Sequence, residues 1–163
     1  MSDRTIINSP EFAQAGTVLR GTLAVSEMKR LRDVLYDDAG TLEFCVQGEC
    51  DARGRPRLRL AVNGVMHLRC QRCLESIAHA VDIATELRLA SEAELGREID
   101  PEEPGDIIPA DVALDVGTLL EDEVLLSLPL APHHAAGACD ARPASGEGSK
   151  PGPFSALARL KKD

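Results

Sequence analysis

Apolar and polar residues alternate along two long segments in the middle of the chain. From Leu58 to Leu68 the even positions are apolar or glycine, and most polar residues stand at the odd positions. From Ile77 to Leu89 the odd positions are mainly apolar. A period of two is typical of half-buried strands. The pattern therefore predicts a hairpin of two long strands, with Cys70 and Cys73 in its tight connection.

The rest of the chain predicts further elements on both sides of this hairpin. They are a helical turn over 9–15, strands over 17–25, 41–49 and 106–108, and helices over 26–37 and 115–128. Ser26 and Asp115 are suitable N-caps for the two helices, and Pro129 ends the second one. The fold class expected from these elements is α+β, a mostly antiparallel sheet of about four or five strands with two main helices packed on it.

The composition changes after the second helix. We predict a single domain over 1–130 and a flexible linker over 131–153, because Ala, Gly, Pro and Ser dominate there. A short docking segment is predicted over 154–163, in which every third residue is apolar: Phe154, Leu157 and Leu160. A helix of this length does not hold alone in water. The segment is therefore expected to dock, either on its own sheet or on a partner.

The overall composition excludes several classes of protein. The 163 residues carry a net charge of −9, and only 2% are aromatic. Such acidity disfavours a broadly basic nucleic-acid binder and gives no attraction to anionic membranes. No apolar run reaches the roughly 18 residues of a membrane span. The first residues lack the apolar core of a signal peptide, and the five cysteines are irregularly spaced, which predicts a cytoplasmic protein with free thiols.

Six arginines and no acid lie between residues 52 and 73: Arg53, Arg55, Arg57, Arg59, Arg69 and Arg72. In an extended chain, positions two apart point to one side, so most of these side chains share the outer face of the sheet. The simpler interpretation is a solvated outer face. A contact with RNA phosphates stays open, because arginine binds phosphate oxygens in a bidentate manner. The lack of aromatic residues argues against stacking on bases.

Three consecutive acids, Glu121, Asp122 and Glu123, lie on the second predicted helix. At 100° per residue Glu123 falls on the apolar side of that helix. A buried carboxylate needs a partner. It is therefore either a core acid with a structural partner or a polar contact in a binding cleft. We count the three acids and the apolar residues of the docking segment as candidates for binding a protein partner.

Cys70 and Cys73 have the spacing of half a tetrahedral zinc site. Two more ligands would be needed. The candidates are Cys139, His133 and His134, with Cys45 and Cys50 elsewhere in the chain. The alternative is a turn fixed without metal. We find no catalytic triad, no phosphate-binding glycine loop and no HExxH motif, so no active site and no small-molecule substrate are indicated.

Four motifs in one order resemble the YceD family, the large ribosomal RNA subunit accumulation protein of bacteria, also represented in plastids. They are Cys70-Gln71-Arg72-Cys73, the block from Leu120 to His133, Cys139, and the stretch from Pro151 to Lys162. The resemblance implies a non-enzymatic role in synthesis, processing or stability of 23S ribosomal RNA. The positions it marks as family signatures are Cys70, Arg72, Cys73, Glu121, Asp122, Glu123, Pro129 and Phe154.

The resemblance also implies that some relatives carry additional C-terminal cysteines that would complete a metal site, whereas Cys139 alone stands there in this chain. We expect an adaptor for ribosomal RNA or pre-ribosomal particles, acting through a protein partner if the acidity prevents direct binding. The alternatives are a metal-dependent RNA-processing hydrolase and a thiol redox module at Cys70 and Cys73.

Overall fold

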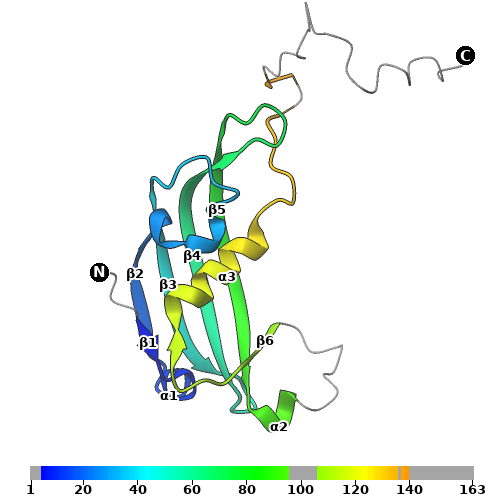
Figure 1. The fold of residues 1–163 in the computed structure, drawn as a ribbon. Helices are drawn as coiled ribbons and strands as arrows, with labels where there is room; N and C mark the ends of the chain where they lie inside the picture. The colour runs from blue at the N-terminus through cyan, green and yellow to red at the C-terminus, as the bar shows by residue number, and fades with distance from the viewer. Residues whose placement is uncertain (1–4, 96–105, 136, 140–163) are drawn as a thin grey trace, which may run out of the picture.

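The computed structural model describes residues 5–95, 106–135 and 137–139. Its centre is a five-stranded sheet in the order β2-β3-β4-β5-β6 (Figure 1). The strands are β2 (Val18–Ala24), β3 (Thr41–Cys50), β4 (Pro56–Arg69), β5 (Ser76–Ala90) and β6 (Asp106–Pro109). Neighbouring strands are antiparallel except β5 and β6, which are parallel. The predicted α+β fold with a mostly antiparallel sheet is confirmed.

The smaller elements lie around this sheet. The helices are α1 (Ser9–Gln14), α2 (Glu92–Leu95) and α3 (Val116–Ser127), and β1 (Ile6–Ile7) pairs with β7 (Leu114–Asp115) in a separate two-stranded sheet. No helix among the described residues has both the length and the apolarity to cross a membrane.

The hairpin predicted from the alternating pattern is β4 and β5. Leu58 pairs with Leu87, and Leu68 pairs with Ile77, so the register keeps the apolar positions of both strands on one face. A shift by one residue would turn every one of these side chains to the opposite face. The hairpin therefore has a buried face and an outer face, and its turn lies at one end of the molecule (Figure 1).

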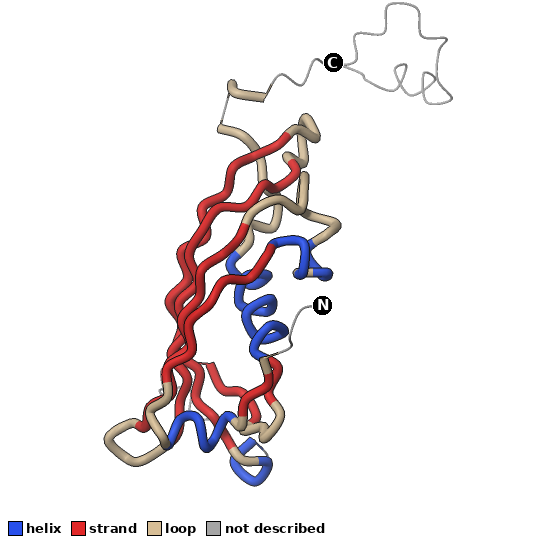
Figure 2. The backbone as a smooth tube through the Cα atoms, turned by 90° about the vertical axis from the view of Figure 1, so that its left-hand side faces the viewer, coloured by secondary structure: helices blue, strands red, loops and turns tan. Residues whose placement is uncertain are grey.

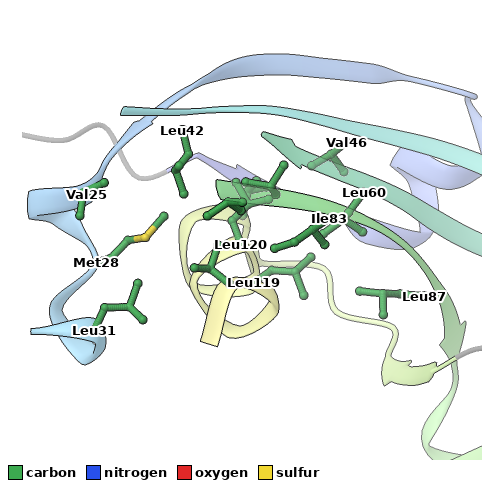
Figure 3. Close-up of a cluster of buried hydrophobic side chains, with 14 of the residues drawn as sticks. Val25, Met28, Leu31, Leu42, Val46, Leu60, Ile83, Leu87, Leu119 and Leu120 are labelled. Atoms are coloured by element: carbon green, nitrogen blue, oxygen red, sulfur yellow. The ribbon is translucent and has the colours of Figure 1, made fainter. Parts of the chain in front are cut away.

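Helix α3 covers the buried face of the sheet, and the curved sheet lies on one side of it (Figure 2). The helix begins as predicted, because the Asp115 side chain accepts a hydrogen bond from the Thr118 amide at 3.2 Å. The core between the two layers is aliphatic (Figure 3) and includes Leu42, Val46, Leu60, Ile83, Leu87, Leu119 and Leu120. Burying each such side chain stabilises the fold by about 1.5–3 kcal/mol.

The helix predicted over 26–37 is wrong. The chain there forms two short 3-10 turns, η1 (Val25–Glu27) and η2 (Lys29–Leu31). Met28, Leu31 and Leu35 are nevertheless buried. The step of three from Met28 to Leu31 suits a 3-10 turn as well as an α-helix, so this part of the apolar pattern does not separate the two. The segment is then tied to β4, because the Tyr36 amide donates to the His67 carbonyl at 2.8 Å.

Helix α1 packs directly on β3 at Gly48. A Cβ atom at this glycine would lie 2.3 Å from the Phe12 carbonyl oxygen and 2.7 Å from the Ala13 Cα. The two backbones can approach this closely only because Gly48 has no side chain.

Candidate metal centre

The turn between β4 and β5 is a compact knuckle built around Cys70. The Cys70 amide donates to the Glu75 carbonyl at 2.9 Å, and the Leu74 amide donates to the Cys70 carbonyl at 2.9 Å. The Arg72 amide points at the Cys70 Sγ, 3.4 Å away. Leu74 has a φ of 65°, a left-handed conformation that is uncommon for a bulky residue. The turn thus holds the Cys70 and Cys73 thiols on one side.

The chain that follows α3 runs to this knuckle (Figure 1). Pro132 is buried, and its carbonyl accepts a hydrogen bond from the Gln71 amide at 2.8 Å. His134 and Cys139 then lie beside the two thiols of the turn. These residues are the first part of the linker predicted over 131–153, and residues 140–153 lie outside the described part of the chain.

Four ligand atoms meet at the knuckle. They belong to Cys70, Cys73, His134 and Cys139, and all lie within 4.8 Å of one another. The Cys70 and Cys139 Sγ atoms are 3.4 Å apart, and His134 Nδ1 lies 3.4 Å from the Cys73 Sγ and 3.5 Å from the Cys139 Sγ. Ligand atoms of a tetrahedral zinc site, at bond lengths of about 2.0–2.3 Å, are separated by roughly 3.5–3.8 Å. The cluster therefore has nearly the dimensions of such a site.

The three thiols of the cluster are not joined by a disulfide. All of the cysteines are free, and the 3.4 Å between the Cys70 and Cys139 sulfurs is far longer than a bond of about 2.05 Å. Three thiols and one imidazole are the donor set that zinc prefers in structural sites. The cluster could thus bind a metal ion such as zinc.

His134 is oriented by the strand next to it. Its Nε2 lies 3.1 Å from the carbonyl oxygen of Ser76, the first residue of β5. Because a carbonyl can only accept, Nε2 carries the proton, and in the neutral ring Nδ1 keeps a free lone pair directed at the thiols. A metal-binding histidine usually donates a hydrogen bond from the ring nitrogen that does not bind the metal, and this bond orients the ring.

The cluster shifts the pKa values of two thiols in opposite directions. At Cys70 burial alone would raise the pKa, but the backbone amides of Cys73, Arg72 and His134 and the thiol of Cys139 stabilise the thiolate and lower its pKa to about 5. At Cys139 burial, followed by the neighbouring Cys70 and Cys73, raises the pKa to about 11. The backbone thus favours negative charge at Cys70, the most buried of the thiols.

The other candidate ligands lie apart from this cluster. His133 is exposed, and its Nδ1 contacts the carbonyl oxygen of Ala131 at 2.8 Å. Cys45 and Cys50 belong to β3 and are not members of the cluster. The structure therefore brings together the four residues that the sequence proposed, Cys70, Cys73, Cys139 and His134.

The six arginines between residues 52 and 73 differ in the contacts of their side chains and form two groups. Arg57 and Arg59 lie beside Glu86 on β5, with nitrogen–oxygen distances of 3.0 Å from Arg57 Nη1 and from Arg59 Nε. Both also lie within 4.0 Å of Glu49 on β3. These contacts raise the pKa of Arg59 and lower the pKa of Glu86, mainly through their mutual hydrogen bond. This part of the outer face is an ion-pair network.

Arg55 is also bound within the fold. Its amide and its Nε donate to the Asp51 carboxylate at 2.9 Å and 2.8 Å, and the Arg53 amide donates to the same carboxylate at 2.8 Å. The hydrogen bond from the Arg55 amide is the main reason that the pKa of Asp51 lies below its usual 3.8. Burial acts in the opposite direction but has a smaller effect. Asp51 therefore fixes the turn between β3 and β4.

Arg69 and Arg72 form the second group. Both are exposed and flank the first cysteine of the knuckle. In the part of the chain that the structure describes, neither side chain has a recorded ion pair or hydrogen bond. Arg69 and Arg72 thus differ from Arg55, Arg57 and Arg59, whose side chains contact carboxylates within the fold.

The acidic helix residues have different surroundings. Glu121 accepts the Arg30 amide at 2.7 Å, and Asp122 pairs with the Arg30 guanidinium. Glu123 is buried, with 8% of its surface exposed, and no hydrogen bond or ion pair of its side chain is recorded among the described residues. The contact of Arg30 with these two acids was not predicted from the sequence, and the place of Arg30 in η2 brings it to α3. The signal was the basic pair Lys29-Arg30 next to a buried apolar residue.

The apolar residues of the predicted docking segment, Phe154, Leu157 and Leu160, lie outside the described residues. Their assignment to partner binding stays a prediction.

One comparison with known proteins identifies a family. The family model described as large ribosomal RNA subunit accumulation protein YceD matches residues 58–161. The matched range includes most of the β4–β5 hairpin, helix α3 and all four residues of the cluster. No curated protein and no solved structure matches the chain.

Proposed function

Because the chain belongs to the YceD family of large ribosomal RNA subunit accumulation proteins, we propose that it promotes the accumulation of 23S ribosomal RNA without catalysing a reaction. Family membership implies a role in the accumulation of the large-subunit ribosomal RNA. Within that role we propose a cytoplasmic adaptor that binds ribosomal RNA or pre-ribosomal particles, directly or through a protein partner. Such binding would act on the synthesis, processing or stability of the RNA.

One observation carries the non-enzymatic part of this proposal, namely the complete ligand set at the knuckle. Structural zinc sites have four protein ligands, whereas catalytic sites use three and leave one position for water or substrate. With Cys70, Cys73, His134 and Cys139 all within reach of one ion, no position is left for an activated water. The ligand set therefore favours a structural centre over a metal-dependent RNA-processing hydrolase.

The thiol redox alternative has less support from the surroundings of the two cysteines. A redox pair of the thioredoxin type needs a thiol with a lowered pKa and a helix after the motif, and Cys70, with a pKa of about 5, meets only the first requirement. Here β5 follows from Ser76. Cys70 and Cys73 also contact the ligands of the second segment, Cys139 and His134.

We propose that the metal is zinc and that its role is structural. When bound, the ion would join the hairpin turn to the chain beyond α3 through bonds to sulfur and nitrogen. The chain itself prepares this link, since the Gln71–Pro132 backbone bond brings the two segments together and Ser76 orients His134. The bound ion would hold the β4–β5 turn and the chain beyond α3 in one conformation that a partner can bind.

The experiment that tests the function compares 23S with 16S ribosomal RNA, with precursors resolved, in cells lacking this protein. We expect a selective loss of mature 23S RNA that the full-length chain restores. An unchanged ratio would refute the proposed role. If expression of an RNA-processing enzyme in place of this protein restored the mature 23S RNA in those cells, the result would instead refute the adaptor and favour an enzyme.

A further inference from the structure

We propose that the knuckle end of the hairpin contacts the phosphate backbone of large-subunit ribosomal RNA through Arg69 and Arg72. This inference rests on the proposed function and names the surface that would touch the RNA. It also excludes Arg57 and Arg59 from that contact.

The argument begins with the partners of the arginines. Arg57 and Arg59 are held by Glu49 and Glu86 across three strands. A phosphate would have to displace these carboxylates and would meet their negative charge. Arg69 and Arg72 have no such competitor among the described residues, so their guanidinium groups are available for a bidentate contact with phosphate oxygens.

The backbone beneath these two arginines is fixed. The Arg69 amide donates to the Val34 carbonyl at 2.9 Å, and the Arg72 amide points to the Cys70 Sγ. The next residue of the turn, Gln71, is bonded to Pro132 on the segment that carries His134. Both side chains therefore project from a part of the chain that its hydrogen bonds hold in place and that a bound metal ion would fix further, which lowers the entropy cost of binding.

The local charge of the knuckle differs from the charge of the whole chain. From residue 68 to residue 76 there are two arginines and one acid, Glu75, and a zinc ion held by three thiolates and one neutral imidazole would add one further negative charge. The knuckle is then close to neutral, whereas the whole chain carries a net charge of −9. At physiological salt, charges farther away than about 8 Å are largely screened. An RNA strand at this end would therefore meet the two exposed arginines on a nearly neutral surface.

The knuckle lacks the aromatic side chains on which unpaired bases stack. Residues 68–76 contain no aromatic side chain, so stacking on unpaired bases, the usual route to single-strand binding, is missing. Contacts with phosphates position a protein on RNA without reading its sequence. The surface is therefore suited to holding RNA whose identity is set by another component of the particle.

The test measures binding of the full-length, metal-loaded protein to a 23S ribosomal RNA transcript at several salt concentrations. Each phosphate contact contributes about 0.7 to 0.9 to the slope of log affinity against log salt. We expect the double variant R69Q/R72Q to lose about 1.4 to 1.8 from that slope and to bind more weakly. The matched control is R57Q/R59Q, which removes the same charge from the ion-pair network and should keep the slope of the wild-type protein.

Three results would overturn the inference. They are an unchanged slope in R69Q/R72Q, an equal loss in both double variants, and no binding of the transcript by the wild-type protein. Metal content and circular dichroism of each variant establish that the fold is intact. Expression of R69Q/R72Q in the deletion strain separates the two proposals: full recovery of 23S RNA would remove the arginine contact but leave the family role, whereas failure of the wild-type chain to restore 23S RNA would remove the role itself.

Discussion

The imidazole of His134 donates through Nε2 to the carbonyl oxygen of Ser76 at 3.1 Å. This one bond sets both the tautomer and the direction of the ring, because the remaining nitrogen must then face Cys73 and Cys139. The neighbouring His133 has no such arrangement, and its Nδ1 lies against the Ala131 carbonyl. Two adjacent histidines are thus distinguished by their hydrogen bonds.

The pair of histidines gives the first prediction. His134→Ala should reduce bound zinc from one ion per chain to a small fraction, because it removes one of the four ligands. His133→Ala should leave the metal content unchanged. Elemental analysis after dialysis measures both, and cobalt substitution adds a spectroscopic signature of a tetrahedral site with sulfur ligands.

The same assay extends to the cysteines. Cys73→Ala should lose the metal as His134→Ala does, and Cys45→Ser on β3 should retain it. Equal metal content in Cys73→Ala and the wild-type protein would remove the four-ligand centre.

The contact between α1 and β3 gives the second prediction. Gly48→Ala should lower the free energy of unfolding by about 2–3 kcal/mol, because the new Cβ would overlap the Phe12 carbonyl and force the two backbones apart. Gly54→Ala should cost only about 1 kcal/mol, since Gly54 has a φ of 76° but nothing within 4 Å of the added atom. Urea unfolding of the two variants checks the order, and a smaller effect at Gly48 than at Gly54 would contradict the packing argument.

Asp51 gives a prediction on pH. Its pKa lies below the usual 3.8 in the folded protein, mainly because the Arg55 amide donates to the carboxylate. A lowered pKa contributes stability that is present above the unfolded value and is lost as the pH falls toward the folded value. Asp51→Asn should therefore be less stable than the wild-type protein at pH 6, and the difference should shrink when the pH falls below about 4.

Urea midpoints at pH 6 and pH 3 measure this effect. The control is Asp82→Asn, since Asp82 is exposed on β5 and no ion pair of its side chain is recorded in the described part of the chain. A difference at Asp51 that is the same at both pH values would show that the lost bond geometry, and not the charge, is responsible.

The fourth prediction concerns two acids of α3 whose surroundings differ. Glu123→Gln should change the free energy of unfolding by less than about 1 kcal/mol, because no side-chain oxygen of the described residues is both buried and without a partner, so this carboxylate reaches water although the residue is only 8% exposed. Glu121→Ala should lower it by up to about 1 kcal/mol, since the Arg30 amide loses its acceptor. Thermal unfolding compares them, and a larger destabilisation by Glu123→Gln would reveal a partner that holds this carboxylate.

The sequence predicted the elements whose signals are local. The alternation along β4 and β5 specified both the hairpin and its buried face, and the cap at Asp115 specified the start of α3. The helix predicted over 26–37 was wrong, because the three-residue step from Met28 to Leu31 suits 3-10 turns equally well. The parallel pairing of β6 with β5 was also not predicted, since partners so far apart leave no periodic signal.

The metal cluster shows the same division. The spacing of Cys70 and Cys73 was visible in the sequence, and Cys139 and His134 were the suitable residues downstream. What the sequence could not supply was the approach of the chain after α3 to the hairpin, which depends on the Gln71–Pro132 bond. The role of Arg30 was hidden for a similar reason, because it contacts residues 91 and 92 positions away.

The spread of the four ligands along the chain has a consequence for how the protein is made. Cys73 and His134 are 61 positions apart, and Cys70 and Cys139 are 69 apart. Because the chain is synthesised from its N-terminus, Cys70 and Cys73 are present before the other two ligands, His134 and Cys139. Full coordination of an ion would become available only once β5, β6, α3 and Cys139 had been synthesised, so metal binding would distinguish a chain that extends past Cys139 from one that stopped before it.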